Sequence, residues 1–598
     1  MTYQSIPALF FEQAARFGER AFLRHKHDGQ WHDHSWRRIA ERARNTAKGL
    51  VALGVAPGDR TCILSENRPE WVVADLASLC AGAADAPIYP TNTAAQCAYV
   101  VNDSGAAVIF VSTAAQLDKL LSARDRMPGL RHLVCFEPPS RRAEGVMTLA
   151  ELEAQGAAAP LDAEVDTRVA ALGPDTLLTL LYTSGTTGEP KGVMLTHGNL
   201  LANCEATARS AHIDERDSMV SFLPLCHSFE RMVGYYMSVF RGGTISYAES
   251  LEKLVDNIGE VRPTVLVSVP RVYEKVYARF MEQAATASGA KKALIRWALK
   301  VGDAVARERE QKRKPTGMLA LEYEVAHRLV FSKISQRLGG RLRFCVSGSA
   351  PLSLDIQRFM LGAGVKVLEG YGLTESSPVI SGNRPDDFRL GSTGRPLDNV
   401  QVRIAEDGEI LARGPNIMKG YWNKPEETRA VLSADGWLAT GDVGHLDGDG
   451  YLWITDRKKD LIKTAGGKYV APQELENLLK LQRFIEQVHV VGDKRPYCVA
   501  VIVPKLEALR PWAREQGVTF ATDAELVKSP KVIAAVQADV DAVNGQLARY
   551  QTIKRFVLAA EPFTQENDQL TPTMKVKRKS VNARYAPEID ALYEGGSD

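Results

Sequence analysis

The chain has 598 residues, of which 45% are hydrophobic and 24% charged, proportions typical of globular proteins. Its 74 Lys and Arg and 72 Asp and Glu residues give a net charge of +2, which offers no electrostatic argument for nucleic-acid binding. The sequence has no secretory signal, no apolar run of membrane-spanning length and no C-x-x-C pair among its eight cysteines, so we expect a cytoplasmic protein without a zinc ribbon.

Short apolar, β-branched runs alternate with longer amphipathic stretches along most of the chain. Buried strands are predicted at 175–184, 217–224, 263–270 and 342–349. This alternation indicates an α/β fold with largely parallel sheets. Residues 400–414 predict a hairpin with Asp407 and Gly408 at its turn.

The pattern changes near Asp456. Residues 447–470 contain two turn signals, a short strand and a cationic run. A smaller α+β pattern follows, with a helix near 472–481, strands near 488–491 and 499–503, and a helix around 531–550. We therefore predict an N-terminal domain at 1–456, a hinge at 457–460 and a C-terminal domain at 461–598, the last with about 140 residues.

A segment rich in glycine and hydroxyl side chains follows the first predicted strand. Residues 182–200 read YTSGTTGEPKGVMLTHGNL. Glycines let backbone N–H groups approach phosphate oxygens, Ser and Thr add donors, and Lys191 adds a positive charge. Neither glycine register fits the G-x-x-x-x-G-K-[ST] pattern. The segment predicts a phosphate-binding loop that is not a Walker A loop, with an ordinary polar loop as the alternative.

The same segment resembles the signature loop of the adenylate-forming superfamily, which includes acyl-CoA synthetases, luciferases and nonribosomal adenylation domains. Further matches follow in the family's order: LPLCHSFER (223–231), VSGSAPL (346–352), EGYGLTES (369–376), GSTGRPL (391–397), GYW (420–422), WLATGDVG (437–444), ITDRKKDLIKTAGGKYVAPQELE (454–476) and LTPTMKVKRK (570–579). The resemblance implies a large N-terminal domain of two α/β subdomains plus a distorted β-barrel, and a small, mobile α+β C-terminal domain.

The resemblance also implies a two-step reaction. A carboxylate attacks the α-phosphate of ATP to give acyl-AMP and pyrophosphate, and a thiol then displaces AMP. Two anions must meet in the first step, so catalysis has to come mainly from positioning and charge stabilisation.

Most of the implied site residues bind the nucleotide. Tyr371 would stack on adenine, Thr374 would contact the α-phosphate, and Glu375 would hold Mg²⁺, a cation suited to carboxylate oxygen. Asp442 would accept hydrogen bonds from the ribose hydroxyls, with Arg457 nearby. The other implied nucleotide contacts are Thr183, Ser184, Gly185, Thr186, Thr187, Gly188, Lys191, Ser349, Ala350, Gly370, Gly372 and Lys468.

Lys575 is the implied catalytic cation, bridging the carboxylate and the α-phosphate in the first transition state. The family usually has glycine before this lysine, whereas Met574 stands there in this chain, as in the long-chain fatty acid branch. The neighbouring Lys577, Arg578 and Lys579 leave a solvated basic run as the alternative.

Two further features are implied by the resemblance. The small domain would rotate about Lys459 between the half-reactions, exchanging Lys575 for the Gly466–Gly467 segment that opens a path for the coenzyme A thiol. His227 would line the acyl carboxylate. A plain turn at the two glycines and a structural histidine are the alternatives.

Residues 271–342 are helical in character and resemble long-chain acyl-CoA synthetases. Residues 291–314 carry nine basic and three acidic side chains, with Leu294, Trp297, Val301 and Val305 at helical spacing. This helix would either rest on an anionic membrane or pack against its own protein.

The sequence therefore predicts a long-chain fatty acid–CoA ligase that uses ATP, Mg²⁺ and coenzyme A. We also expect peripheral contact with the inner face of the membrane and a homodimer. The alternatives are a fatty acyl-AMP ligase loading a carrier protein, a CoA ligase for another acid such as an aryl or bile acid, and a non-catalytic scaffold or lipid-binding protein.

Overall fold

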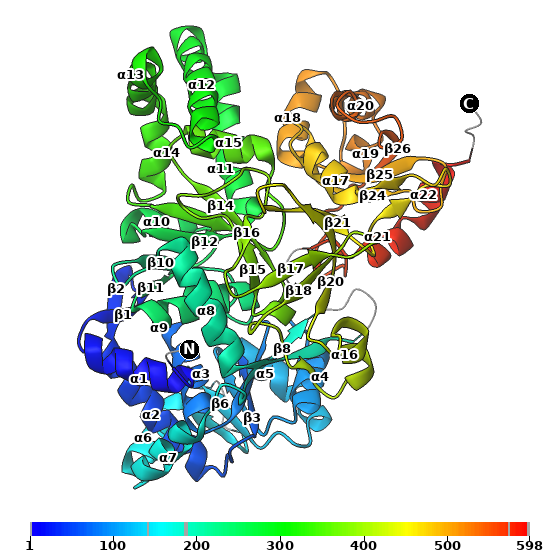
Figure 1. Ribbon diagram of the computed structural model, residues 1–598. Coiled ribbons are helices and arrows are strands. Elements are labelled where there is room, and N and C mark those ends of the chain that lie inside the picture. The colour runs from blue at the N-terminus through cyan, green and yellow to red at the C-terminus, as the bar shows by residue number, and fades with distance from the viewer. Residues whose placement is uncertain (1–2, 140–142, 184–188, 572–574, 595–598) are drawn as a thin grey trace.

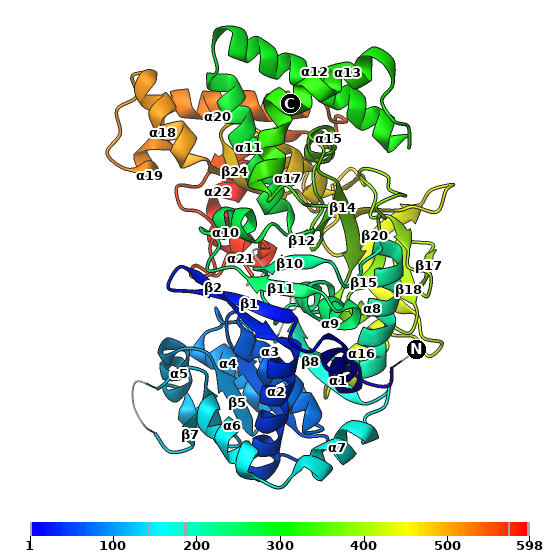
Figure 2. The ribbon, with the colours of Figure 1, turned by 90° about the vertical axis from the view of Figure 1, so that its left-hand side faces the viewer.

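The computed structural model describes residues 3–139, 143–183, 189–571 and 575–594. Two large sheets, a small antiparallel sheet and a helical projection form the N-terminal part of the chain, and a smaller α+β domain follows (Figure 1, Figure 2). The predicted α/β architecture is confirmed. None of the helices within these ranges is long and apolar enough to cross a membrane.

The first sheet has eight strands. In sheet order they are β19 (Gly420–Tyr421), β9 (Lys191–Thr196), β8 (Leu177–Thr183), β4 (Ala84–Ile88), β3 (Arg60–Leu64), β5 (Val108–Val111), β6 (His132–Cys135) and β7 (Val146–Thr148). The pairs from β8 to β7 are parallel, whereas β8–β9 and β9–β19 are antiparallel. Strands β4 and β5 are buried along their whole length, as expected for parallel strands covered by helices. The predicted strand at 175–184 corresponds to β8.

The second sheet has nine strands and contains the other three predicted strands. In sheet order they are β16 (Arg395–Pro396), β15 (Val379–Gly382), β14 (Val367–Gly372), β13 (Phe344–Ser347), β12 (Val265–Ser268), β10 (Ser218–Ser221), β11 (Thr244–Tyr247), β1 (Ala21–His27) and β2 (Gln30–Ser35). Strands β14 to β1 pair in parallel, and antiparallel strands close both edges.

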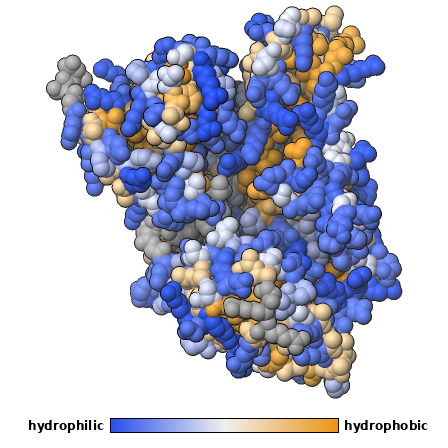
Figure 3. Space-filling view, turned by 180° about the vertical axis from the view of Figure 1, so that it is seen from behind, coloured by the Kyte–Doolittle hydropathy of each residue, from blue (hydrophilic) through white to orange (hydrophobic). Residues whose placement is uncertain are grey.

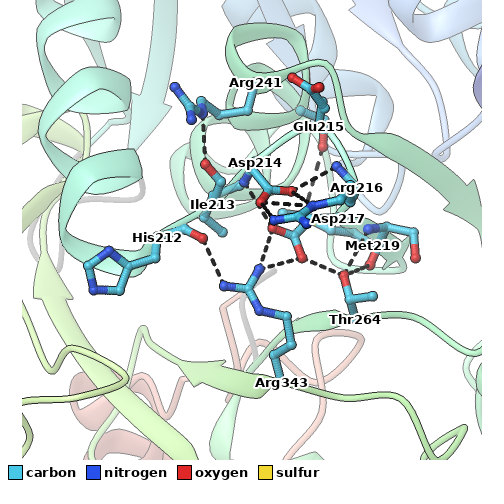
Figure 4. Close-up of polar contacts among 12 residues, drawn as sticks. His212, Ile213, Asp214, Glu215, Arg216, Asp217, Met219, Arg241, Thr264 and Arg343 are labelled. Atoms are coloured by element: carbon cyan, nitrogen blue, oxygen red, sulfur yellow. Dashed lines mark hydrogen bonds and ion pairs between the residues drawn. The ribbon is translucent and has the colours of Figure 1, made fainter.

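A polar network ties the amino ends of three central strands together (Figure 4). Asp217, Thr264 and Arg343 immediately precede β10, β12 and β13. The buried Asp217 carboxylate accepts hydrogen bonds from Thr264 Oγ1 at 2.7 Å and from Arg343 Nη1 at 2.7 and 2.6 Å. Arg343 Nη2 also donates to the carbonyl of His212 at 2.8 Å. The network fixes the strand register at the amino-end edge of the sheet. Ligands of parallel sheets bind at the opposite edge, at the carboxyl ends of the strands.

Helices and short helical turns surround the two sheets. They are α1 (Ile6–Phe17), α2 (Trp36–Ala52), α3 (Pro69–Cys80), α4 (Ala94–Ser104), α5 (Ala114–Leu121), η1 (Arg124–Arg126), α6 (Leu149–Ala158), α7 (Asp162–Ala171), α8 (His197–Ala211), the π-helical η2 (Glu230–Tyr236), α9 (Met237–Arg241), α10 (Leu254–Val261), η4 (Thr374–Ser376) and α16 (Pro425–Val431). Helix α8 begins directly after β9 because the Thr196 and Asn199 side chains form a capping box there.

The predicted helical stretch forms a projection above the second sheet. It comprises α11 (Pro270–Thr286), α12 (Gly289–Glu310), α13 (Gly317–Ala326), the π-helical η3 (His327–Phe331) and α14 (Ser332–Arg337), with α15 (Leu354–Gly362) beneath. Val301 and Val305 of α12 are buried, and Leu294 and Trp297 are half-buried. Gly302 and Gly362 let α12 and α15 pack in backbone contact, since a Cβ on Gly362 would lie 2.6 Å from the Gly302 carbonyl oxygen. The apolar stripe of α12 therefore packs against the protein itself.

A four-stranded antiparallel sheet lies where the third N-terminal subdomain is expected. Its strands are β17 (Gln401–Ile404), β18 (Glu409–Arg413), β20 (Leu438–Leu446) and β21 (Leu452–Arg457). Strands β17 and β18 form the hairpin predicted at 400–414. The long strands β20 and β21 lead toward the C-terminal domain (Figure 1).

The C-terminal domain has its own buried core, which runs from Ile462 to Ile553. Its elements are β22 (Ile462–Lys463), β23 (Tyr469–Val470), α17 (Pro472–Lys480), β24 (Ile485–Val491), β25 (Cys498–Pro504), α18 (Leu506–Glu515), α19 (Asp523–Leu526), α20 (Pro530–Asn544), β26 (Ile553–Leu558), α21 (Arg578–Arg584) and α22 (Ala586–Ala591). The predicted strands and the helix near 472–481 are confirmed, whereas the helix predicted at 531–550 ends at Asn544, where Gly545 follows. The exact hinge at 457–460 stays a prediction.

Candidate active site

A cleft of about 4450 Å³ runs between the two domains and continues into the helical projection. It is lined by most of the predicted site residues that the structure describes: Thr183, Lys191, His227, Ser349, Ala350, Gly370, Tyr371, Gly372, Thr374, Glu375, Asp442, Arg457, Lys459 and Lys575. Ser184, Gly185, Thr186, Thr187, Gly188 and Met574 lie outside the described residues. The cleft thus brings together motifs that are almost 400 residues apart in the sequence.

The hairpin β8–β9 holds the base of the predicted phosphate loop. Thr183 pairs with Lys191 at the loop end of the hairpin, so the glycine-rich segment begins and ends at neighbouring positions. Tyr99 donates a hydrogen bond to the carbonyl of Pro190 at 2.9 Å. Lys191 Nζ lies 5.0 Å from the centroid of the Tyr421 ring, a cation–π distance. Lys191 is therefore positioned at the cleft as a cation.

The second half of the signature segment has a structural role. Thr196 caps α8, and the buried His197 accepts a hydrogen bond from the Ile6 backbone N–H at 3.2 Å. Burial lowers the pKa of His197 to about 3, so the ring is neutral. The Asn199 amide donates to the carbonyls of Pro415 and Ile417. These contacts support the strand and helix that follow the loop, and none of Thr196, His197 and Asn199 lines the cleft.

Asp442 and Arg457 are brought together by strand register. They are cross-strand partners on β20 and β21, and Arg457 Nε lies 3.1 Å from Asp442 Oδ1. Tyr371, from the end of β14, donates a hydrogen bond to Asp442 Oδ2 at 2.6 Å. Burial raises the pKa of Asp442 above its usual value, and the Arg457 guanidinium partly offsets this effect. The carboxylate is thus an oriented acceptor at the predicted ribose site.

Glu375 sits in the short helical turn η4, just after β14. Its Oε1 accepts a hydrogen bond from the Tyr421 hydroxyl at 2.8 Å. The neighbouring Thr374 hydroxyl lies 3.3 Å from the Ser228 hydroxyl. Tyr421 therefore contacts both the carboxylate and Lys191, a role that the sequence motif GYW did not reveal.

The donor set fits Mg²⁺ bound together with ATP. Among the described residues, no group of three or more His, Cys, Asp or Glu side chains could hold a metal alone. Mg²⁺ commonly takes one or two carboxylates and completes its shell with water and substrate phosphates. The single Glu375 carboxylate, which shares its neighbour Tyr421 with Lys191 at the base of the predicted phosphate loop, matches that requirement.

Lys575 enters the cleft from the C-terminal domain. The surrounding protein, and next the positive charge of Arg457, lower the pKa of Lys575 to about 8, while Asp442 opposes the shift, although part of the residue is exposed to solvent in the cleft. Across the cleft, two effects lower the pKa of His227 to about 4: burial, which is the larger, and the positive charge of Lys575. The imidazole is therefore neutral at pH 7. Groups from both domains therefore meet at this point.

The loop contacts distinguish Lys575 from Lys577 and Arg578, two of the three basic residues that follow it. Lys577 Nζ pairs with Asp568, and Arg578 forms two hydrogen bonds with Glu476 at 2.8 and 3.0 Å. The Lys575 backbone N–H donates to Thr571 Oγ1 at 3.0 Å. Lys577 and Arg578 thus anchor the segment to its own domain. Lys575 and Lys579 both line the cleft, and the assignment of Lys575 as the catalytic lysine stays a prediction.

Gly466, Gly467 and Lys468 lie on the exposed turn between β22 and β23, away from the cleft-lining residues. Lys459, at the start of the domain, does line the cleft. This arrangement brings Lys575 in and leaves the glycine segment outside. Lys468 is accordingly not brought to the predicted nucleotide site in this arrangement.

Sequence reasoning missed Arg231, the last residue of the LPLCHSFER motif. Its buried guanidinium contacts Asp75 and Asp85 at 2.5 and 2.8 Å and donates to Thr179 Oγ1 at 2.9 Å. The Arg231 backbone N–H also donates to the His227 carbonyl at 3.0 Å. The network attaches the His227 turn to the first sheet. The sequence did offer a signal for a buried, paired arginine, because Arg231 directly precedes the apolar run MVGYYMSVF.

The chain was also compared with known proteins. A family model described as AMP-binding enzyme matches residues 10–422, and a model described as AMP-binding enzyme C-terminal domain matches residues 459–597. The chain is 36% identical over 596 residues to the long-chain-fatty-acid–CoA ligase FadD15 of Mycobacterium bovis, covering 99% of this chain and 97% of that protein. It is 35% identical over 603 residues to the peroxisomal long chain acyl-CoA synthetase 6 of Arabidopsis thaliana, covering 96% of this chain and 84% of that protein.

Among solved structures, the anthranilate CoA ligase AuaEII in complex with anthranoyl-AMP is similar in fold. Its TM-score is 0.75 at 20% sequence identity, with 99% of both chains covered. This likeness supports the fold, and the two family models and the full-length relatives support the family. The family predicted from the motifs is confirmed: the chain belongs to the AMP-binding enzyme family.

Proposed function

We propose that this protein joins a long-chain fatty acid to coenzyme A in two steps, using ATP and Mg²⁺. In the first step the carboxylate attacks the α-phosphate of ATP, forming acyl-AMP and releasing pyrophosphate. In the second step the thiol attacks the acyl carbonyl and AMP leaves. The overall reaction follows from the family and from full-length relatives that are named for this activity. The placement of Lys575 in the interdomain cleft carries the residue assignments below.

In the first step, Lys575 would stabilise negative charge as the carboxylate oxygen approaches the α-phosphate. Arg457 adds a second positive charge, and Asp442 would hold the ribose hydroxyls, so that the α-phosphate faces the carboxylate. Lys191 and the phosphate loop would bind the leaving pyrophosphate. When bound, Mg²⁺ would neutralise phosphate charge beside Glu375.

In the second step, the C-terminal domain would turn about Lys459. Such a rotation would withdraw Lys575 and bring Gly466 and Gly467 to the cleft. This turn is exposed, and the hydrogen bonds of its backbone are to Thr464 and Arg495 of the same domain, so they could be kept during the rotation. Glycines without side chains would let a narrow pantetheine arm pass close to the backbone.

The deep part of the cleft supports a long acyl chain as substrate. Beyond His227 the cleft continues between α11, α12, η3 and α14, where apolar side chains line it: Val272, Val276, Leu294, Ile295, Val330 and Ile334. An apolar lining of this extent favours a long flexible hydrocarbon over a short polar acid.

The test is to incubate the protein with ATP, Mg²⁺ and palmitate, with and without coenzyme A, and to identify products by mass spectrometry. We expect palmitoyl-CoA and AMP. Palmitoyl-AMP that never becomes a thioester would instead indicate an acyl-AMP ligase. Absence of any product from palmitate, followed by turnover of another acid in a panel, would overturn the acyl-chain assignment. The homodimer and the cytoplasmic location stay predictions, the former testable by light scattering.

A further inference from the structure

Glu369, the first residue of the EGYGLTES motif, is the centre of a buried hydrogen-bond network. It lies on β14, two residues before Tyr371, and its side chain is buried. Its Oε1 accepts a hydrogen bond from the Leu352 backbone N–H at 2.8 Å, and its Oε2 accepts one from Gln357 Nε2 at 2.6 Å. Both carboxylate oxygens are therefore oriented by donors of the protein itself.

Gln357 connects this carboxylate to two further segments. It is a buried residue of α15 and lies outside all the motifs identified in the sequence. Its Nε2 also donates to the Leu352 carbonyl at 2.8 Å, and its Oε1 accepts a hydrogen bond from the Gly391 backbone N–H at 3.0 Å. Glu369 and Gln357 thus join the motifs VSGSAPL, EGYGLTES and GSTGRPL, and the first two of these carry predicted nucleotide contacts.

The VSGSAPL loop needs such support, because part of its backbone has an uncommon conformation. Ser349, a predicted nucleotide contact, has a φ of +69°, in the left-handed region that residues other than glycine rarely adopt. Such a conformation persists only where the surrounding contacts determine it. Three residues later, Leu352 has its N–H held by Glu369 and its carbonyl held by Gln357. These two side chains therefore fix the end of the loop that carries Ser349 and Ala350.

We propose that Glu369 and Gln357 are positioning residues, which hold the VSGSAPL loop in the arrangement that binds the AMP part of ATP. The inference rests on the proposed function, because that function makes this loop part of the nucleotide site. Glu369 also lines the cleft, which Figure 3 shows as a hollow between the C-terminal domain and the helical projection, so direct contact with the nucleotide is the competing role. Gln357 does not line the cleft, so any effect of Gln357 on nucleotide binding has to be indirect.

Binding of AMP, measured by isothermal titration calorimetry at pH 8, tests the pair directly. Burial raises the pKa of Glu369 to about 7, while its two hydrogen bonds lower it, so the carboxylate is mostly ionised at this pH. An amide accepts through one oxygen only, so Glu369→Gln leaves one buried donor without an acceptor and should raise the Kd for AMP on the order of tenfold. Gln357→Met keeps the length of the side chain but removes the amide, and should raise this Kd severalfold.

Two further measurements separate positioning from a general loss of structure. The KM for ATP should rise with the Kd for AMP, whereas the KM for palmitate should change by less than about twofold. The double variant Glu369→Gln, Gln357→Glu should recover part of the affinity for AMP. The reason is that the amide at position 369 can then donate to a carboxylate at position 357, which restores one hydrogen bond of the network.

Asp217→Asn is the matched control. Asp217 is a buried carboxylate of the same sheet that accepts hydrogen bonds from Thr264 and Arg343 (Figure 4). It lies at the opposite edge of the sheet and does not line the cleft. Its variant should lower the urea midpoint of unfolding and leave the Kd for AMP unchanged.

An unchanged Kd for AMP in both Glu369→Gln and Gln357→Met would overturn the proposal. So would a raised Kd in Glu369→Gln alone, since Glu369 would then contact the nucleotide itself, and so would an equal rise in Asp217→Asn, since lost stability would then explain the effect. If Glu369→Gln does not fold, Gln357→Met decides. Palmitoyl-CoA formation by the wild type is scored separately: its absence would contradict the proposed function, whereas AMP binding that weakens in Gln357→Met would still support the positioning pair.

Discussion

Replacing Arg231 with methionine should destabilise the N-terminal domain strongly. Methionine keeps much of the apolar volume but removes the cation shared by Asp75 and Asp85, both fully buried. Removing one partner of a buried ion pair typically costs about 3–5 kcal/mol, because a charge is left uncompensated. Two carboxylates lose their cation here, and Asp85 Oδ2 already has no hydrogen-bond partner. We therefore expect a loss of about 4 kcal/mol in the free energy of unfolding near pH 8.

The loss should depend on pH in a defined direction. Burial raises the pKa of Asp75 to about 7 even with Arg231 present, so the folded state holds a proton that the unfolded state releases near pH 4. Stability from this group is present at low pH and is lost as pH rises through about 7. Without Arg231 the carboxyl holds its proton more tightly. The variant should therefore be less destabilised at pH 6 than at pH 8.

The assay is urea denaturation followed by tryptophan fluorescence, with the transition of the N-terminal domain compared at both pH values. Arg231→Lys keeps the charge and should cost less than Arg231→Met. Adding Asp75→Asn to Arg231→Met should restore part of the lost stability, because it removes one uncompensated charge. A destabilisation below about 1 kcal/mol, or no recovery in the double variant, would refute the reasoning.

Three further predictions concern catalysis. Glu375→Gln should raise the Mg²⁺ concentration needed for half-maximal pyrophosphate release by at least about tenfold, because a neutral amide binds this cation more weakly; an unchanged requirement would place Mg²⁺ elsewhere. The pKa of Lys575 is lowered to about 8, so pyrophosphate release should fall as pH rises through that value and the lysine loses its charge. Lys575→Arg should abolish this decline. A pH profile that stays flat above pH 8 would contradict the cationic role. Lys459→Pro should slow steady-state acyl-CoA formation more than single-turnover adenylation, and unchanged turnover would rule out Lys459 as the hinge.

Local patterns were enough to predict the elements that surround the site. Strands β8, β10, β12 and β13 were found from short apolar runs, and the motifs identified Asp442, Arg457 and Lys575 because each lies in a distinctive local sequence. Strand register then explains how two of these, Asp442 and Arg457, become neighbours.

Contacts between distant segments could not be predicted in the same way. Arg231 lies 156 residues from Asp75, and Tyr421 lies 46 residues from Glu375, so no periodicity links either pair. Amphipathicity identified the apolar stripe of α12 without identifying what covers it. Val301 and Val305 of the stripe are buried where α12 packs against α15, and peripheral membrane contact stays a prediction.

Lys575 is proposed to act in the adenylation step only. The direct measurement compares wild type with Lys575→Ala in the two half-reactions: pyrophosphate release from ATP and palmitate, and palmitoyl-CoA formation from supplied palmitoyl-AMP and coenzyme A. Pyrophosphate release should fall by at least about a hundredfold, because that is the scale of losing one preorganised charge. Thioester formation from palmitoyl-AMP should change little. Equal losses in both half-reactions, or none in the first, would contradict it.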